Sequence, residues 1–194
     1  MKKQGVLVIC HGSSNEQWVK QVDDCMKQVH IPVPVETAFL EMVDDRTITH
    51  GIKKLEEGGV SEIIAIPLFV SSGSTHIEEI SYLLGLQTNP QITIEEEPIS
   101  HHASIKLLAP MNDHPLILEI LTERVLSLTD NPRDARIVLV GHGSDLSWFQ
   151  TEWGRVADQI VSRLYEKLQP KSISYAFTLP NNLRDRLEEE IQAG

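Results

Sequence analysis

Apolar residues in this chain form short continuous runs that alternate with stretches of helical periodicity. The segment 5–10, GVLVIC, is the first such run, and it stops at the polar sequence His11-Gly12-Ser13-Ser14. A short apolar run bounded by Gly and Ser predicts a buried strand of a parallel sheet, because helices on both faces remove the need for alternating polarity. We therefore expect His11 at the carboxyl end of a strand, the edge where open α/β sheets bind ligands.

The same alternation continues through the first two thirds of the chain. The patterns predict strands at 33–40, 62–70, 91–96 and 105–109, and helices at 16–29, 47–57, 77–84 and 115–128. Residues 71–76, SSGSTH, form the loop before the third helix, and their Ser and Gly residues are typical of an anion cradle of N–H groups and hydroxyls. The alternation predicts an α/β fold of the flavodoxin-like type, a parallel sheet with helices on both faces.

A second His-Gly-Ser occurs in RIVLVGHGSD at 136–145. The strands and helices expected after it lie at 137–140, 147–168, 172–178 and 180–192. The chain is therefore predicted to contain an α/β domain at 1–128, a linker at 129–135 and a partial second repeat at 136–194. Two strands and two helices make a poor independent core, so the second half is expected either to pack on the first or to belong to a longer protein.

Composition narrows the function classes. The formal net charge of −11 argues against a nucleic-acid partner, which needs clustered Lys and Arg. The sequence has no apolar span of the roughly 18 residues that cross a membrane. Cys10 and Cys25 lack a C-x-x-C spacing and predict structural thiols in a reduced, cytoplasmic protein.

Three ligand-type side chains follow neighbouring strands in the expected order 2-1-3-4. Glu41, His11 and His76 lie in the loops after the second, first and third strands. Because parallel strands lie about 4.8 Å apart, we expect the three side chains to converge at one edge of the sheet. Two imidazoles and a carboxylate suit a divalent ion such as Co²⁺, Fe²⁺ or Ni²⁺.

Other interpretations of His-Gly-Ser fit the sequence less well. A hydrolase elbow needs G-x-S-x-G, and a dinucleotide fingerprint needs G-x-G-x-x-G; neither pattern is present at the two motifs. A phosphohistidine phosphatase would want Arg directly before the His, where this chain has Cys10 and Gly141.

Four motifs resemble those of the CbiX-type class II chelatases, which insert cobalt or iron into sirohydrochlorin. They are the HGS after the first strand, Phe39-Leu40-Glu41, PLFVSSGSTH at 67–76, and Ala109-Pro110 ahead of the Pro115 helix entry. The resemblance covers the first 128 residues closely and the second half as a weaker copy. One departure is the pair Ser74-Thr75 between Gly73 and His76, where many members have a single residue.

The resemblance implies a chelatase-like fold and a lyase of cobalamin or siroheme biosynthesis. It would insert Co²⁺, with Fe²⁺ and Ni²⁺ as alternatives, and would need no permanently bound cofactor because the metal is a substrate. His11, His76 and Glu41 are the implied metal ligands and catalytic residues. The imidazoles would hold the ion, accept the pyrrole protons, or do both, with Glu41 orienting or relaying.

The tetrapyrrole substrate carries carboxylates that an acidic protein must bind locally. The residues expected to do so, by hydroxyls and loop N–H groups, are Ser13, Ser14, Ser72, Gly73 and Ser74. The sequence leaves open whether two chains pair as a homodimer, so that a second chain encloses the side of the site that the partial repeat leaves uncovered.

The two repeats are not equivalent. Aligning 38–41 with 176–179 puts Leu179 where Glu41 stands, and the second half offers no counterpart of His76. We therefore expect one working site, in the first half, with His142 structural and His101-His102 in an exposed loop. The alternative function is a non-catalytic metal-binding or scaffold protein derived from the same fold.

Overall fold

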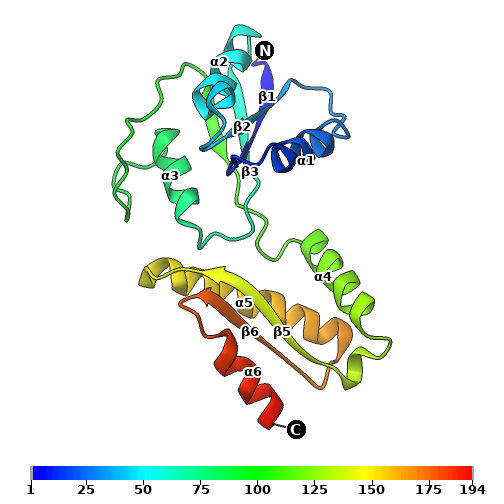
Figure 1. Ribbon diagram of the computed structural model, residues 1–194. Coiled ribbons are helices and arrows are strands. Elements are labelled where there is room, and N and C mark those ends of the chain that lie inside the picture. The colour runs from blue at the N-terminus through cyan, green and yellow to red at the C-terminus, as the bar shows by residue number, and fades with distance from the viewer. Residues whose placement is uncertain (1, 194) are drawn as a thin grey trace. The chain divides into compact units, whose positions relative to one another are not determined.

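The computed structural model describes residues 2–193, which form two compact units of mixed α/β structure (Figure 1). One unit comprises the N-terminal residues up to Phe69 together with Thr75–Pro110, and the other comprises Val70–Ser74 and the residues from Met111 onward. The first unit contains β1 (Gln4–Cys10), α1 (Glu16–Met26), β2 (Val35–Phe39), α2 (Ile48–Glu57), β3 (Glu62–Pro67), α3 (Thr75–Leu83) and β4 (Ser104–Leu107). The second contains α4 (Pro115–Leu128), β5 (Arg136–Gly143), α5 (Ser147–Leu168), β6 (Ser172–Leu179) and α6 (Leu183–Gln192).

The first unit confirms the predicted parallel sheet. Its strand order is β2-β1-β3-β4 and every pairing is parallel. Successive side chains of β1 face opposite sides of the sheet. Leu7 and Ile9 pack in the cluster that includes residues of α2 and α3, whereas Val6, Val8 and Cys10 pack in the cluster that includes residues of α1. Both faces of β1 are therefore covered, which explains the continuous apolar run.

The strand predicted at 91–96 is wrong, because that segment has no strand structure. Hydrogen bonds from Gln91 and from Ile99, just after the segment, go to α3 instead of to a neighbouring strand. The Gln91 N–H donates to the carboxylate of Glu78, and the Ile99 N–H donates to the carbonyl of Leu83 at 2.8 Å. The fourth strand of the sheet is β4, paired with β3 over Glu62–Ala65.

The second unit consists of a two-stranded parallel sheet, β5-β6, and three helices. Leu118 of α4 is buried against Val156, Ile160, Leu164 and Leu168 of α5. Both α5 and α6 contact the two-stranded sheet, and α4 packs on α5 and extends this small core. The compact units thus divide near residue 110, whereas the predicted boundary at 128–136 follows the sequence repeat.

The β5–β6 pair repeats the geometry of β1–β2. Val140 faces Ala176 and Gly141 faces Phe177, as Ile9 faces Ala38 and Cys10 faces Phe39. A Cβ on Gly12 would lie 1.9 Å from the carbonyl oxygen of Glu41, and one on Gly143 would lie 2.0 Å from that of Leu179. Leu179 therefore occupies the backbone position of Glu41, so the second copy lacks that carboxylate.

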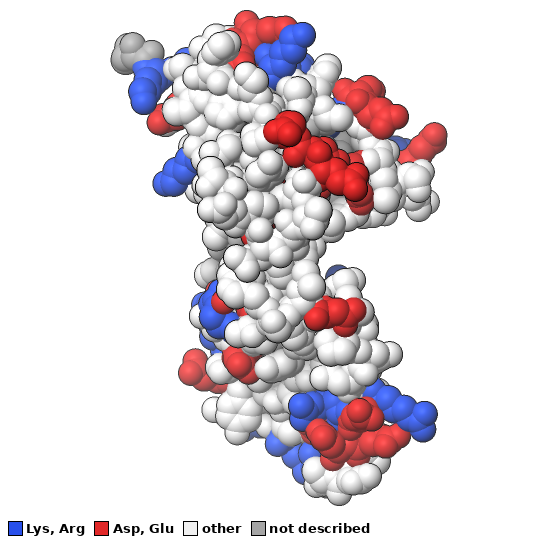
Figure 2. All heavy atoms as spheres, turned by 90° about the vertical axis from the view of Figure 1, so that its left-hand side faces the viewer, with Lys and Arg blue, Asp and Glu red and all other residues white. Residues whose placement is uncertain are grey.

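No helix among residues 2–193 combines the length and apolar character that a bilayer-spanning segment requires. On the face drawn in Figure 2, charged side chains occur in small groups, several of which contain both basic and acidic residues. This face has no continuous basic surface of the kind that nucleic-acid binding requires.

Candidate metal centre

His11 directly follows β1, where the chain after β2 continues the parallel pairing beside it. The Leu40 N–H donates to the Cys10 carbonyl at 2.9 Å, and the Glu41 N–H donates to the His11 carbonyl at 3.0 Å. Gly12 permits this approach, with φ at 105° and no side chain to collide with the Glu41 carbonyl. As a result, Glu41 Oε1 lies 3.2 Å from His11 Nε2.

His76 comes from the other side of β1. The helix α3 begins at Thr75, two residues before the predicted start, so His76 lies in its first turn. His76 Nε2 is 3.2 Å from His11 Nε2, and the two rings meet edge to face with centroids 4.6 Å apart. The buried Phe69 ring lies 6.4 Å from the His11 ring and 5.9 Å from the His76 ring, which gives the pair an apolar neighbour.

The Nδ1 contacts determine which nitrogens can bind a metal. His11 Nδ1 lies 3.0 Å from the carbonyl oxygen of Gly12, and His76 Nδ1 lies 3.1 Å from Glu79 Oε2. A carbonyl and a carboxylate only accept, so each Nδ1 carries a proton and donates it. In the neutral imidazoles both Nε2 atoms then have lone pairs, and His11 Nε2 lies 3.2 Å from His76 Nε2 and 3.2 Å from Glu41 Oε1, which is also an acceptor. A shared proton or a cation between them satisfies both.

The separation of these donor atoms suits a metal ion. Metal–nitrogen bonds of about 2.1 Å place neighbouring donors about 3.0–3.4 Å apart in octahedral or tetrahedral shells. The observed Nε2 to Nε2 distance of 3.2 Å lies within that range. Within residues 2–193, however, no group of three or more His, Cys, Asp or Glu side chains is arranged to hold an ion. The structure therefore brings His11, His76 and Glu41 together as an open cluster and not as a closed cage.

Glu79 is the member of this cluster that the sequence analysis missed. It lies one helical turn after His76 on α3, and the two side chains are about one quarter to one third exposed. Residues three apart on a helix are neighbours on its surface. A His followed three residues later by Glu, directly after a loop at the sheet edge, is the sequence pattern that could have identified Glu79 as a partner of His76.

Ser13 and Ser14 lie between β1 and α1. Ser13 Oγ accepts the N–H of Asn15 at 3.1 Å, and Asn15 caps α1 by accepting the Gln17 N–H at 2.9 Å. Ser14 is exposed. Both serines belong to the same compact unit as the histidines, so their hydroxyls remain candidates for binding a polar ligand.

The N–H groups of the loop Ser72-Gly73-Ser74 all have acceptors within the protein. They donate to Asn112 Oδ1 at 2.8 Å, to Ser71 Oγ at 3.0 Å and to the Ser71 carbonyl at 3.1 Å, respectively. A Cβ on Gly73 would lie 2.6 Å from the backbone nitrogen of Trp153, so this glycine is needed for packing against α5. The loop is part of the second compact unit, and a role for it in substrate binding stays a prediction.

Two other groups near the sequence motifs are structural. Cys10 is buried, and burial raises the pKa of its thiol to about 11, so at neutral pH it is not a thiolate ligand. His101 places Nδ1 at 2.8 Å from the Ala103 carbonyl and Nε2 at 3.2 Å from the Leu84 carbonyl. Its ring therefore connects the 99–103 segment to the end of α3.

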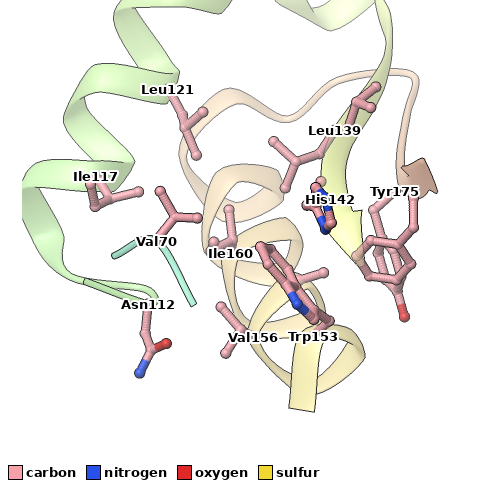
Figure 3. Close-up of a pocket in the computed structure, with 14 residues that line it drawn as sticks. Val70, Asn112, Ile117, Leu121, Leu139, His142, Trp153, Val156, Ile160 and Tyr175 are labelled. Atoms are coloured by element: carbon pink, nitrogen blue, oxygen red, sulfur yellow. The ribbon is translucent and has the colours of Figure 1, made fainter. Parts of the chain in front are cut away.

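His142 repeats the local geometry of His11 without its partners. Its Nδ1 lies 3.0 Å from the Gly143 carbonyl, as His11 Nδ1 does from Gly12. It lines an apolar cavity of about 260 Å³ in the second unit, together with Trp153 and Ile160 of α5 and Leu139 of β5 (Figure 3). With Leu179 in place of the carboxylate, this position has no comparable ligand set.

The fold and this cluster define a class: a doubly wound α/β protein with paired imidazoles at the carboxyl edge of its parallel sheet. The CbiX family model matches residues 5–128, more than half of the chain. The chain therefore belongs to the CbiX family.

Curated relatives agree with that assignment, and a solved structure shares the fold. The sirohydrochlorin cobaltochelatase of Methanosarcina barkeri is 29% identical over 127 residues, 64% of this chain and 95% of that protein. The enzyme of the same name from Methanosarcina acetivorans is 34% identical over 88 residues, 44% of this chain and 67% of that protein. The structure of SirB from Bacillus subtilis with Fe³⁺ matches with a TM-score of 0.68 at 21% identity, and the match covers 90% of this chain and 65% of that chain, just under two thirds.

Proposed function

We propose that this protein is a sirohydrochlorin chelatase that inserts a divalent metal ion at the His11–His76 pair. The observation that carries the proposal is the 3.2 Å approach of two Nε2 atoms whose Nδ1 atoms both donate to oxygen acceptors. The lone pairs of the two Nε2 atoms can bind a metal cation together, and the cation then takes the place of the proton that lies between them. The names of the curated relatives support sirohydrochlorin as the acceptor of the metal.

The cluster has the parts that metal insertion requires. A tetrapyrrole must lose two pyrrole protons while the ion loses ligands and moves onto the pyrrole nitrogens. The histidines would hold the ion beside the macrocycle through Nε2 and would accept protons once the ion has left. Glu41, 3.2 Å from His11 Nε2, would take part in holding the ion and pass protons toward solvent, since its side chain is 44% exposed. Because several coordination positions of the ion stay open, the pyrrole nitrogens can enter its shell before the imidazoles leave.

The finer features of the proposal follow from chemistry and from the relatives. Co²⁺ is the proposed metal, since the relatives are named cobaltochelatases, and Fe²⁺ and Ni²⁺ suit the same donors. Ser13 and Ser14 are proposed to bind the carboxylates of the substrate by hydrogen bonds. The free thiols Cys10 and Cys25 favour a reducing compartment such as the cytoplasm. Pairing of two chains into a homodimer remains part of the proposal.

The test is the absorbance change when sirohydrochlorin and Co²⁺ are mixed with the protein. Wild-type protein should accelerate insertion above the spontaneous rate, and His11→Ala and His76→Ala should each remove most of that acceleration. His142→Ala is the matched control, because it removes the same residue from the same motif in the other repeat. A wild-type rate equal to the spontaneous rate would contradict the proposal and favour a metal-binding or scaffold role.

A further inference from the structure

The two imidazoles of the cluster have chemically different partners at Nδ1. His11 donates to the neutral carbonyl oxygen of Gly12 at 3.0 Å. His76 donates to Glu79 Oε2 at 3.1 Å, and this acceptor is a carboxylate. Charge-assisted hydrogen bonds are roughly twice as strong as neutral ones. The tautomer and ring orientation of His76 are therefore held more firmly than those of His11.

The carboxylate also changes the donor strength of His76. An imidazole that donates its N–H to an anion is more electron-rich at the opposite nitrogen, and metal-bound histidines commonly have such a carboxylate behind them. The Glu79 side chain is 26% exposed and that of His76 is 32% exposed, so water screens the pair only in part. His76 Nε2 is thus the stronger of the two donors that meet at 3.2 Å.

We propose that Glu79 is a positioning residue that makes His76 the anchoring ligand of the metal substrate. The inference rests on the proposed function, which it deepens by distinguishing the two histidines. Glu79 acts through His76, whereas Glu41 lies against Nε2 of His11 on the side where the ion binds. Removing Glu79 should therefore weaken binding of the ion itself, before any tetrapyrrole is present.

The experiment measures Co²⁺ affinity by calorimetry without tetrapyrrole, and then the insertion rate at saturating Co²⁺. Glu79→Gln keeps the shape of the side chain and removes its charge. It should weaken Co²⁺ binding by about 10-fold to 100-fold, the range found for such outer partners, and should change the saturated rate much less. The matched control is Glu78→Gln on the same helix, because the Glu78 carboxylate faces Gln87 and Gln91 and not His76.

A spectroscopic measurement separates this role from a merely structural one. Two-bond nitrogen–proton correlation spectra of the imidazoles should show the Nδ1–H tautomer for His76 in the wild-type protein. Glu79→Ala removes the acceptor and should shift His76 toward the Nε2–H tautomer, with His11 unchanged. An unaltered His76 tautomer in Glu79→Ala would overturn the inference.

The binding outcomes are distinguishable from those of the proposed function. Equal Co²⁺ affinity in wild type and Glu79→Gln, or equal losses in Glu79→Gln and Glu78→Gln, would overturn the role of Glu79 while leaving chelation intact. Selective weakening in Glu79→Gln with no acceleration of insertion by the wild type would support Glu79 and refute the chelatase. Failure of the wild type to bind Co²⁺ would overturn both.

Discussion

At the scale of single residues, Gly12 determines how closely the β2–α2 loop approaches His11. Its φ of 105° lies where side chains are disfavoured, and a Cβ there would lie 1.9 Å from the Glu41 carbonyl. The same carbonyl belongs to the residue whose carboxylate contacts His11. A change at Gly12 therefore acts on both stability and the candidate metal site.

Gly12→Ala should lower the free energy of unfolding by more than the roughly 1–2 kcal/mol expected for a left-handed non-glycine residue. Urea denaturation measures the loss. Gly59→Ala is the control, because Gly59 has φ at 79° but a Cβ added there would meet no heavy atom within 4 Å, so it carries the conformational cost alone. If Gly12→Ala is no less stable than Gly59→Ala, the close approach of the Glu41 carbonyl adds no cost beyond that of the positive φ.

The two cysteines should differ in reactivity. Burial raises the pKa of Cys10 to about 11, while Cys25 is exposed on α1. A thiol reagent such as an aromatic disulfide should modify one cysteine of the native protein at pH 8 and two in denaturant. Peptide mapping should locate the modification at Cys25. Rapid native modification of Cys10 would show that β1 is not a buried strand.

At the scale of elements, polar side chains secure the irregular segment between α3 and β4. Glu56 of α2 accepts the N–H groups of His102 at 2.6 Å and Ala103 at 2.7 Å. The hydrogen bond from the Ala103 N–H lowers the pKa of the Glu56 carboxyl below its usual value. The segment ends at β4, the outer strand of the sheet, so its attachment helps to hold that strand.

Glu56→Gln should destabilise the protein at pH 7 by about 1 kcal/mol, because Gln keeps an acceptor oxygen but replaces hydrogen bonds to a charged group with weaker neutral ones. Because the folded pKa is lowered, this stabilisation is present above the unfolded pKa of about 4.3 and is lost as pH falls through the folded value. The difference between wild type and Glu56→Gln in denaturant midpoints should therefore shrink below pH 4. Glu57→Gln, at an exposed neighbouring carboxylate, is the control. A difference that is constant with pH would show that the ionised Glu56 carboxylate is not the source of the stabilisation.

The elements also show what the sequence could and could not predict. Continuous apolar runs and Gly or Pro boundaries correctly predicted β1 and β3, because a strand covered on both faces need not alternate. The flavodoxin-like fold type correctly predicted the order of the first three strands, whereas the fourth position is taken by β4 and not by 91–96. The segment 91–96 has strand-like composition, but the Glu78 carboxylate takes its Gln91 N–H. A competing acceptor that lies outside the segment leaves no pattern in the segment's own sequence.

The convergence of His11, Glu41 and His76 was predictable because strand order and chain direction determine which loops meet. The role of Glu79 was not deduced, since helical spacing alone does not distinguish a partner of His76 from a solvated carboxylate. The N–H groups of 72–74 were expected to be free, but their acceptors, Ser71 and Asn112, become apparent only in three dimensions.

At the scale of the whole molecule, the chain divides into units that do not follow its repeat. The helix α4 comes before the second His-Gly-Ser strand, yet it packs on α5 in the second unit. Sequence periodicity reports which face of a helix is apolar but not which partner covers it. The stability of the β5–β6 unit should accordingly depend on α4.

Leu118→Ala should destabilise the second unit by about 2–5 kcal/mol, since it removes a buried side chain from the α4–α5 contact. Hydrogen exchange followed by mass spectrometry should show faster exchange in peptides from α4, α5, β5 and β6, with little change in peptides from β1 to β3. Leu116→Ala, at a 59% exposed position of the same helix, is the control. Equal acceleration in both units would contradict the division of the chain near residue 110.

The metal-handling role of the His11–His76 pair is tested most directly by locating the metal. Crystals soaked with Co²⁺ should give an anomalous difference peak at the cobalt edge within bonding distance of Nε2 of both His11 and His76, and the peak should vanish in His76→Ala. A peak at His101, at His142 or at any other position, with none between His11 and His76, would contradict the claim that this pair is the metal-handling site.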